Sequence, residues 1–151
     1  MGISGLILRK INKLNLEETK TTLTAILDRC GCRYKADLCT SNYKGCSYNY
    51  YFISAASHKP KKCSFVMYVY GEGIPEYKKG DFEWIDNDLT AVINIEDISG
   101  CEETLIRLLY EYFKYYPDDY FYDEFEWHYN KENIDKIHNS QNYSGWCYRK
   151  P

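Results

Sequence analysis

The sequence predicts a single α+β domain in which an antiparallel sheet of about four strands carries helices on one face. Its 151 residues suffice for one ordinary domain with its own core, and a hydrophobic content of 44% argues against long disordered segments. Two pairs of strand-like segments predict two hairpins, and segments with a helical period stand before and after them. No internal repeat, linker or low-complexity tract divides the chain, so the domain should span residues 1–151.

Before the first hairpin, the pattern predicts one helix. Residues 3–11 hold a short apolar run that fits either an edge strand or the first turn of a helix. Asn15 and Glu18 have the spacing of a capping box. The helix that follows them should end near Arg29, because Gly31 is a natural stop.

The first hairpin is predicted from two apolar segments, residues 48–55 and residues 63–70. A basic turn, His58-Lys59-Pro60-Lys61-Lys62, separates them. Residues 31–47 are rich in small and turn-forming types, so we expect a surface loop with a possible short strand near residues 34–38.

The second hairpin is predicted from residues 82–85 and 89–95, with Asp86-Asn87-Asp88 as its turn. In the second of these segments apolar residues alternate with others, as in a strand with one buried face. The residues expected on that face are Leu89, Ala91, Ile93 and Ile95.

The clearest helix in the sequence begins near Ser99 and ends near Tyr116. Ser99 and Glu102 have the spacing of a capping box, and Pro117 cannot continue a helix. Steps of three and four place one set of apolar residues on a common face. These are Leu105, Leu108, Leu109, Tyr112, Phe113 and Tyr116.

The end of the chain is less regular. Residues 118–129 are ambiguous between helix and extended structure. Asn130 can cap a last helix over residues 131–138. The tail, residues 139–151, lacks periodicity, and Trp146 is the residue that could anchor it.

Charge is distributed unevenly along the chain. Residues 1–80 contain 13 Lys and Arg against 6 Asp and Glu, a net charge of +7, whereas residues 81–151 contain 6 against 16, a net charge of −10. The two halves can neutralise each other when they fold together, or an acidic face can remain and attract a basic partner. Because the acidic half would repel phosphate, we expect no direct binding of nucleic acid.

The chain contains seven cysteines and no segment typical of secretion or membrane insertion. We therefore expect reduced thiols, a cytoplasmic location and no membrane partner. Four of the cysteines form a C-x-C-x6-C-x6-C pattern, which departs from the paired spacing of zinc knuckles. A zinc-stabilised module stays open as an alternative, but we expect no cofactor. The four residues are Cys30, Cys32, Cys39 and Cys46.

No established catalytic motif is present: the sequence has no G-x-S-x-G, no phosphate-binding glycine loop and no H-E-x-x-H. A cysteine nucleophile would need an adjacent base. His58, His128 and His138 stand in contexts typical of surface or half-buried histidines. We therefore predict that the protein is not an enzyme, with a cysteine-based enzyme as the alternative.

Carboxylates alternate with aromatic rings after Pro117, and this segment is the candidate binding site. Carboxylates can neutralise Lys and Arg on a partner while the rings supply contact area. The expected partner is therefore a cationic protein such as a nuclease toxin. The alternative is a solvated acidic segment that covers the basic half of the same chain. The candidate residues are Asp118, Asp119, Tyr120, Tyr122, Asp123, Glu124, Glu126 and Trp127.

The last third of the chain, with ETLIRLLYEYFKYYPDDYF and DEFEWHYNKENIDKI, resembles small immunity proteins of bacterial toxin–immunity systems, in particular those of contact-dependent growth inhibition. The resemblance covers residues 98–137 and rests on overall character: a single acidic, Tyr-rich domain with hairpins followed by a helix. It implies a non-catalytic cytoplasmic inhibitor that binds a cognate toxin domain and covers its active or substrate-binding surface. It gives neither the identity of the toxin nor the oligomeric state.

Overall fold

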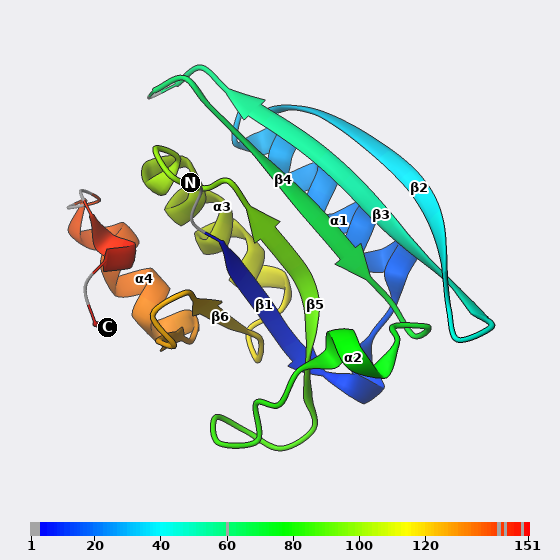
Figure 1. The fold of residues 1–151 in the computed structure, drawn as a ribbon. Coiled ribbons are helices and arrows are strands. Elements are labelled where there is room, and N and C mark those ends of the chain that lie inside the picture. Colours follow the sequence, from blue (N-terminus) through cyan, green and yellow to red (C-terminus); the bar gives the residue numbers. More distant parts are fainter. Residues whose placement is uncertain (1–3, 60, 142, 144, 149) are drawn as a thin grey trace.

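The computed structural model describes residues 4–59, 61–141, 143, 145–148, 150 and 151 (Figure 1). Within them, one antiparallel sheet has the strand order β2-β3-β4-β5-β1-β6-β7. The strands are β1 Gly5–Lys10, β2 Arg33–Tyr43, β3 Cys46–Ser57, β4 Cys63–Tyr70, β5 Leu89–Glu96, β6 Tyr120–Asp123 and β7 His128–Tyr129. The helices are α1 Leu16–Arg29, α2 Glu76–Lys79, α3 Glu102–Tyr115 and α4 Lys131–Ser140, with short 3-10 helices at Ile11–Lys13 and Trp146–Tyr148.

The predicted α+β class is confirmed, but the prediction of about four strands is wrong because the sheet has seven. The apolar run left open between strand and helix is β1, and it lies inside the sheet between β5 and β6. Most of the predicted surface loop is β2, which pairs with β3 along its whole length. Both faces of β2 are largely exposed, so its sequence carries no apolar alternation that would reveal a strand.

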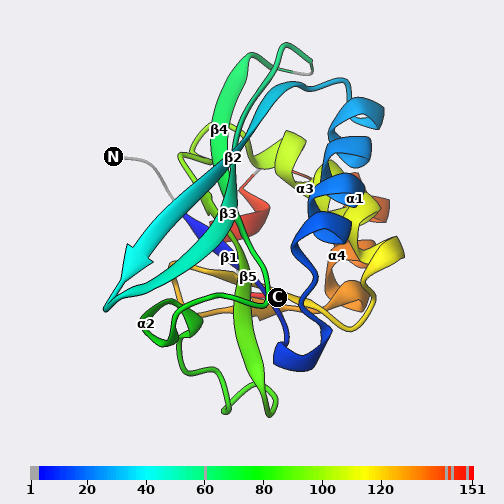
Figure 2. The ribbon, with the colours of Figure 1, turned by 90° about the vertical axis from the view of Figure 1, so that its right-hand side faces the viewer.

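Three helices, α1, α3 and α4, lie on one face of the sheet and cover the main core (Figure 2). Ile53, Met67 and Ile95 stand side by side on β3, β4 and β5, and all three are fully buried. On α3, the apolar face predicted from the sequence is buried from Leu105 to Phe113. Burial of apolar area in this core therefore holds α3 and strands β3, β4 and β5 together.

A bulge in the pairing of β1 with β5 changes which side of the sheet alternate residues face. The register shifts between Ile7, opposite Ile93, and Leu8, opposite Ala91. The prediction of one common buried face for β5 is therefore wrong. Ile93 and Ile95 belong to the helix-covered core, whereas Leu89 and Ala91 pack with Leu8 and Phe82 in a second cluster.

Residues 82–85 form a turn rather than the predicted strand. The backbone N–H groups of Ile85 and Asp86 both donate to the carbonyl of Phe82, at 2.9 and 3.2 Å. The ring of Phe82 is buried in the second cluster, so this segment covers the sheet instead of extending it. Trp84, two residues on, is 59% exposed.

The predicted cap at Asn130 is present, and at Asn15 half of the predicted capping box is present. Asn15 and Asn130 each accept a hydrogen bond from the backbone N–H three residues on, while the side chain of Glu18 accepts from the Tyr116 hydroxyl. The capping box predicted at Ser99 is wrong, because α3 starts at Glu102 and Cys101 is its N-cap residue. The predicted stop at Pro117 is confirmed, since α3 ends at Tyr115.

Trp146 anchors the tail, as predicted. Its side chain is 1% exposed, and its indole N–H donates to the carbonyl of Glu102 at 2.7 Å. Its ring packs against Phe121 on β6 and Tyr129 on β7. The end of the chain is thus fixed to the start of α3 and to the hairpin that carries the candidate binding site.

Candidate functional site

The acidic, aromatic segment after Pro117 forms the hairpin of β6 and β7 beside β1. Neighbouring residues of a strand face opposite sides of a sheet, so the hairpin cannot present every candidate residue on one surface. Asp119 and Asp123 are 4% and 3% exposed, whereas Asp118, Glu124 and Glu126 are exposed. The candidates therefore divide into buried and displayed residues.

Asp119 belongs to a buried polar cluster rather than to a contact surface. Its Oδ2 accepts from Arg9 Nε at 3.0 Å and from the Tyr112 hydroxyl at 2.7 Å. Arg9 also donates to Thr19 Oγ1 at 2.8 Å, and its guanidinium lies 3.8 Å from the ring centre of Tyr116. Burial raises the pKa of Asp119, while the Arg9 charge acts against this rise. Asp119 thus lies inside the fold, where it neutralises an arginine of its own chain, and not on the displayed surface of the hairpin.

Asp123 is also turned inward, where it shapes the turn between β6 and β7. Its Oδ1 accepts from the backbone N–H groups of Phe125 and Trp127 at 2.9 and 3.0 Å, and its Oδ2 accepts from the Tyr129 hydroxyl at 3.2 Å. Burial raises the pKa of Asp123, and the hydrogen bonds from Trp127, Phe125 and Tyr129 oppose that rise. Asp123 thus lies inside the fold, where it positions residues 124–127.

The turn that Asp123 holds displays carboxylates next to aromatic rings. Glu124 is exposed and accepts from the backbone N–H of Ser4 at 2.7 Å. Glu126 is also exposed, and its backbone adopts the left-handed conformation, with φ of 62°. Phe125, 49% exposed, packs against the half-buried Trp127 with 5.2 Å between ring centres.

Trp84 extends this surface, although it lies far away in the sequence. Its ring centre is 5.4 Å from that of His128 and 6.1 Å from that of Tyr122. Together with Glu126, Trp127 and His128 it lines a hollow of about 470 Å³, whose wall also includes Lys150. We call Trp84, Tyr122, Phe125, Trp127 and His128 the aromatic patch. The exposed carboxylates next to these rings in the sequence are Glu83, Glu124 and Glu126, of which Glu126 also lines the hollow.

Trp84 is the residue that sequence reasoning missed. Its assignment to a strand concealed its exposure, since a strand with one buried face would have placed a tryptophan in the core. The available signal was its position in an acidic turn, between Asp81 and Asp88. Such a turn is rarely buried, and an exposed tryptophan is a common anchor of protein interfaces.

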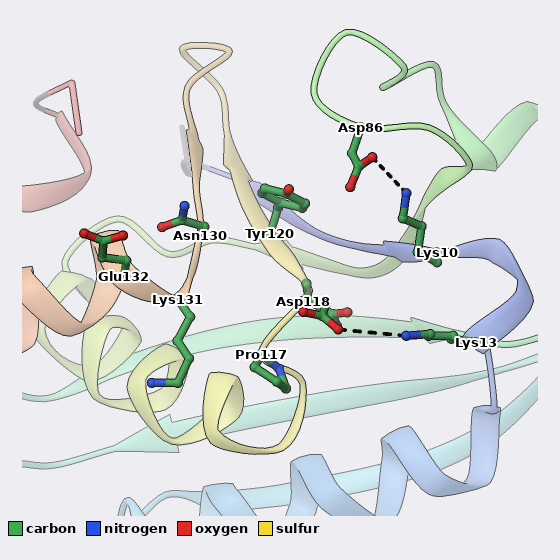
Figure 3. Close-up of a pocket in the computed structure, with 10 residues that line it drawn as sticks. Lys10, Lys13, Asp86, Pro117, Asp118, Tyr120, Asn130, Lys131 and Glu132 are labelled. Atoms are coloured by element: carbon green, nitrogen blue, oxygen red, sulfur yellow. Dashed lines mark ion pairs between the residues drawn. The ribbon is translucent and has the colours of Figure 1, made fainter.

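Asp118 and Tyr120 lie beside a different hollow of about 380 Å³, shown in Figure 3. Its walls carry both signs of charge, and the acids are partly paired: Lys13 lies 3.9 Å from Asp118, and Lys10 lies 2.9 Å from Asp86. We place the candidate site at the aromatic patch because its rings are exposed, with Trp84 59% and Phe125 49% accessible. Asp118 and Tyr120 lie outside it.

The fold places the four cysteines of the candidate zinc pattern too far apart to share one ion. Cys32 precedes β2 and Cys46 begins β3, so the 11 residues of β2 separate them by roughly 30 Å. One zinc ion cannot bind thiolates at that separation. Among the described residues no group of three or more His, Cys, Asp and Glu is placed to hold a metal ion.

Four of the seven thiols lie in environments that disfavour a nucleophile. Burial raises the pKa of Cys30 to about 11 and that of Cys147 to about 12, and it also raises the pKa of Cys32 and Cys101. Thiols of this kind are largely protonated at neutral pH and react slowly.

No helix within the described residues has both the length and the apolar character needed to cross a bilayer. Comparison of the chain with protein-family models, with curated proteins and with solved structures gave no match.

Proposed function

We propose that this protein is a cytoplasmic immunity protein that binds a cationic toxin domain through the aromatic patch and covers the toxin's active or substrate-binding surface. The observation that carries the proposal is Trp84, which is 59% exposed on the turn before β5, contacts the rings of Tyr122 and His128, and lines one hollow with Glu126. Exposed tryptophans of this kind supply much of the binding energy of protein interfaces. The carboxylates around the patch would select a partner that carries Lys and Arg.

The mode of inhibition is occlusion. A nuclease toxin holds its nucleic acid with cationic side chains that contact phosphates. The carboxylates of Glu83, Glu124 and Glu126 would pair with those cationic side chains in place of phosphate. Trp84 and Trp127 would exclude water from the contact between the two proteins. No reaction by the immunity protein is needed, which agrees with the inert environment of its buried thiols.

The contact residues differ from those expected from the sequence alone. Tyr122, Glu124, Glu126 and Trp127 remain in the proposed contact surface, and Trp84 is added to them. Asp119 and Asp123 act inside the protein, where they support the hairpin that carries the patch.

The test is binding to the toxin domain encoded beside the gene of this protein. Wild-type protein should bind that domain and restore growth of cells that produce it. Trp84→Ala should weaken binding about 100-fold, as loss of a hot-spot tryptophan does, and Glu126→Lys should weaken it about ten-fold.

The matched control is Glu72→Lys, a charge reversal at an exposed position just after β4, which is three places from β6 in the sheet. It should bind like the wild type. Normal binding by Trp84→Ala, with circular dichroism showing an intact fold, would remove the patch from the proposal. Absence of binding by the wild type would remove the proposed function.

A further inference from the structure

The two edges of the sheet are built differently. The edge at β7 is 2 residues long, and α4 follows it directly. The edge at β2 is 11 residues long, with an unbroken register to β3 from Arg33, opposite Ala56, to Tyr43, opposite Cys46. No other strand of the described residues pairs with β2, which forms the outer rim of the sheet (Figure 1).

The β2 edge lacks two of the features that normally prevent pairing with another chain, since it contains no proline and no bulge. It does carry charged side chains, and its one lysine, Lys35, is on the face opposite that of Ala36, which pairs with the core residue Ile53. Leu38, at the middle of β2, is 57% exposed, and Tyr34, near its start, is 37% exposed. A long, regular edge with exposed apolar side chains is a template for a further strand.

The sequence of β2 is complementary to itself about Ala36. Lys35 and Asp37 flank Ala36 on one face, and Tyr34 and Leu38 flank it on the other. Two copies of β2 that run antiparallel about Ala36 would place Lys35 of each copy opposite Asp37 of the other. They would also place each Tyr34 opposite the other copy's Leu38.

We propose that β2 pairs antiparallel with β2 of a second copy of this chain, centred on Ala36, so that two seven-stranded sheets become one continuous sheet. Opposite charges and an aromatic–aliphatic pair directly across two antiparallel strands both stabilise the pairing. Within one chain Lys35 and Asp37 form a long ion pair with each other at 3.9 Å, and their side chains are 78% and 49% exposed. The dimer would exchange this exposed pair in each copy for two pairs between the copies.

The charges of Lys35 and Asp37 also favour pairing about Ala36 over pairing about Leu38. Pairing about Leu38 would set Asp37 opposite Cys39 and Lys35 opposite Ser41, and neither charge would meet its opposite. The dimer leaves the aromatic patch free, because the patch lies on the turn after β6 and on the turn before β5, away from β2 in the sheet order. The inference therefore does not depend on the proposed function.

Sedimentation velocity of the purified chain over a wide range of concentration tests the dimer. The wild type should shift from monomer to dimer as its concentration rises. Lys35→Asp and Asp37→Lys should each weaken dimerisation about ten-fold or more, because each puts like charges opposite each other twice per dimer. Lys61→Asp, an exposed charge reversal in the turn before β4, should dimerise like the wild type.

Mixing the two single variants gives the decisive result. A Lys35→Asp copy and an Asp37→Lys copy are complementary at both pairs, so together they should form a heterodimer of near wild-type affinity. A wild type that stays monomeric overturns the proposal, as do single variants that dimerise normally. A mixture that stays monomeric, with each variant's thermal melting unchanged, overturns the register about Ala36.

Discussion

At the scale of single residues, the buried pair of Arg9 and Asp119 shows how the charge asymmetry of the chain is partly resolved. The two residues are 110 positions apart and come from the basic and the acidic half. Their side chains are 3% and 5% exposed, so each charge depends on the other and on the hydroxyls of Tyr112 and Thr19. A buried ion pair of this kind is compensated only while both partners are present.

We therefore expect Arg9→Met to lower the free energy of unfolding by about 3–5 kcal/mol at pH 7, because Asp119 is left buried without its cation. The loss should shrink in acid. An unpaired buried carboxyl has a raised pKa in the folded state, so its unfavourable contribution disappears as the pH falls through that pKa and the group is protonated.

Urea denaturation at several pH values measures this effect. The double variant Arg9→Met with Asp119→Leu should recover part of the loss, since it contains no buried charge. A loss below about 1 kcal/mol for Arg9→Met, or a double variant no more stable than the single one, would contradict the assigned role of the pair.

At the scale of elements, the hairpin of β6 and β7 links the fold to the candidate site. Its turn is held by one carboxylate, Asp123, which accepts from two backbone N–H groups and one tyrosine hydroxyl. The rings of Phe125 and Trp127 are attached to those two backbone groups, so the position of the patch depends on a residue that faces inward.

Asp123→Ala should lower the free energy of unfolding by about 2–3 kcal/mol, because it leaves buried hydrogen-bond donors without an acceptor. Asp123→Asn should be milder, since its amide oxygen can still accept from the turn. Chemical denaturation of both variants measures the difference. Equal stability of the alanine variant and the wild type would show that the turn forms without Asp123.

The elements also show what the sequence can predict. Apolar period and proline located α3 to within a few residues, and Asn15 and Asn130 located the starts of α1 and α4, because these signals are local. The β-bulge at Val92 and the inward turn of Asp119 could not be predicted, because both depend on strands that pair across the whole chain. The exposure of Trp84 was missed for the same reason, since Phe82 is the ring that the sheet buries there.

At the scale of the whole molecule, charge and contact area have separate tasks. The acidic residues 81–151 carry a net charge of −10, and only part of it is neutralised inside the fold by contacts such as that of Arg9 with Asp119. In the proposed complex, the remaining carboxylates would act over a distance and set how fast a cationic partner arrives. The rings of the aromatic patch would act only on contact and set how long the partner stays.

This division predicts different kinetic signatures for the two groups in binding to the cognate toxin domain. Raising the ionic strength should lower the association rate constant and leave the dissociation rate constant nearly unchanged, because salt screens long-range attraction. Glu126→Lys should mainly slow association, whereas Trp84→Ala should mainly speed dissociation. Surface plasmon resonance at low and high salt separates the two constants. An association rate independent of salt would show that the acidic rim does not steer the partner, and slower association with unchanged dissociation in Trp84→Ala would show that the ring is not an anchor.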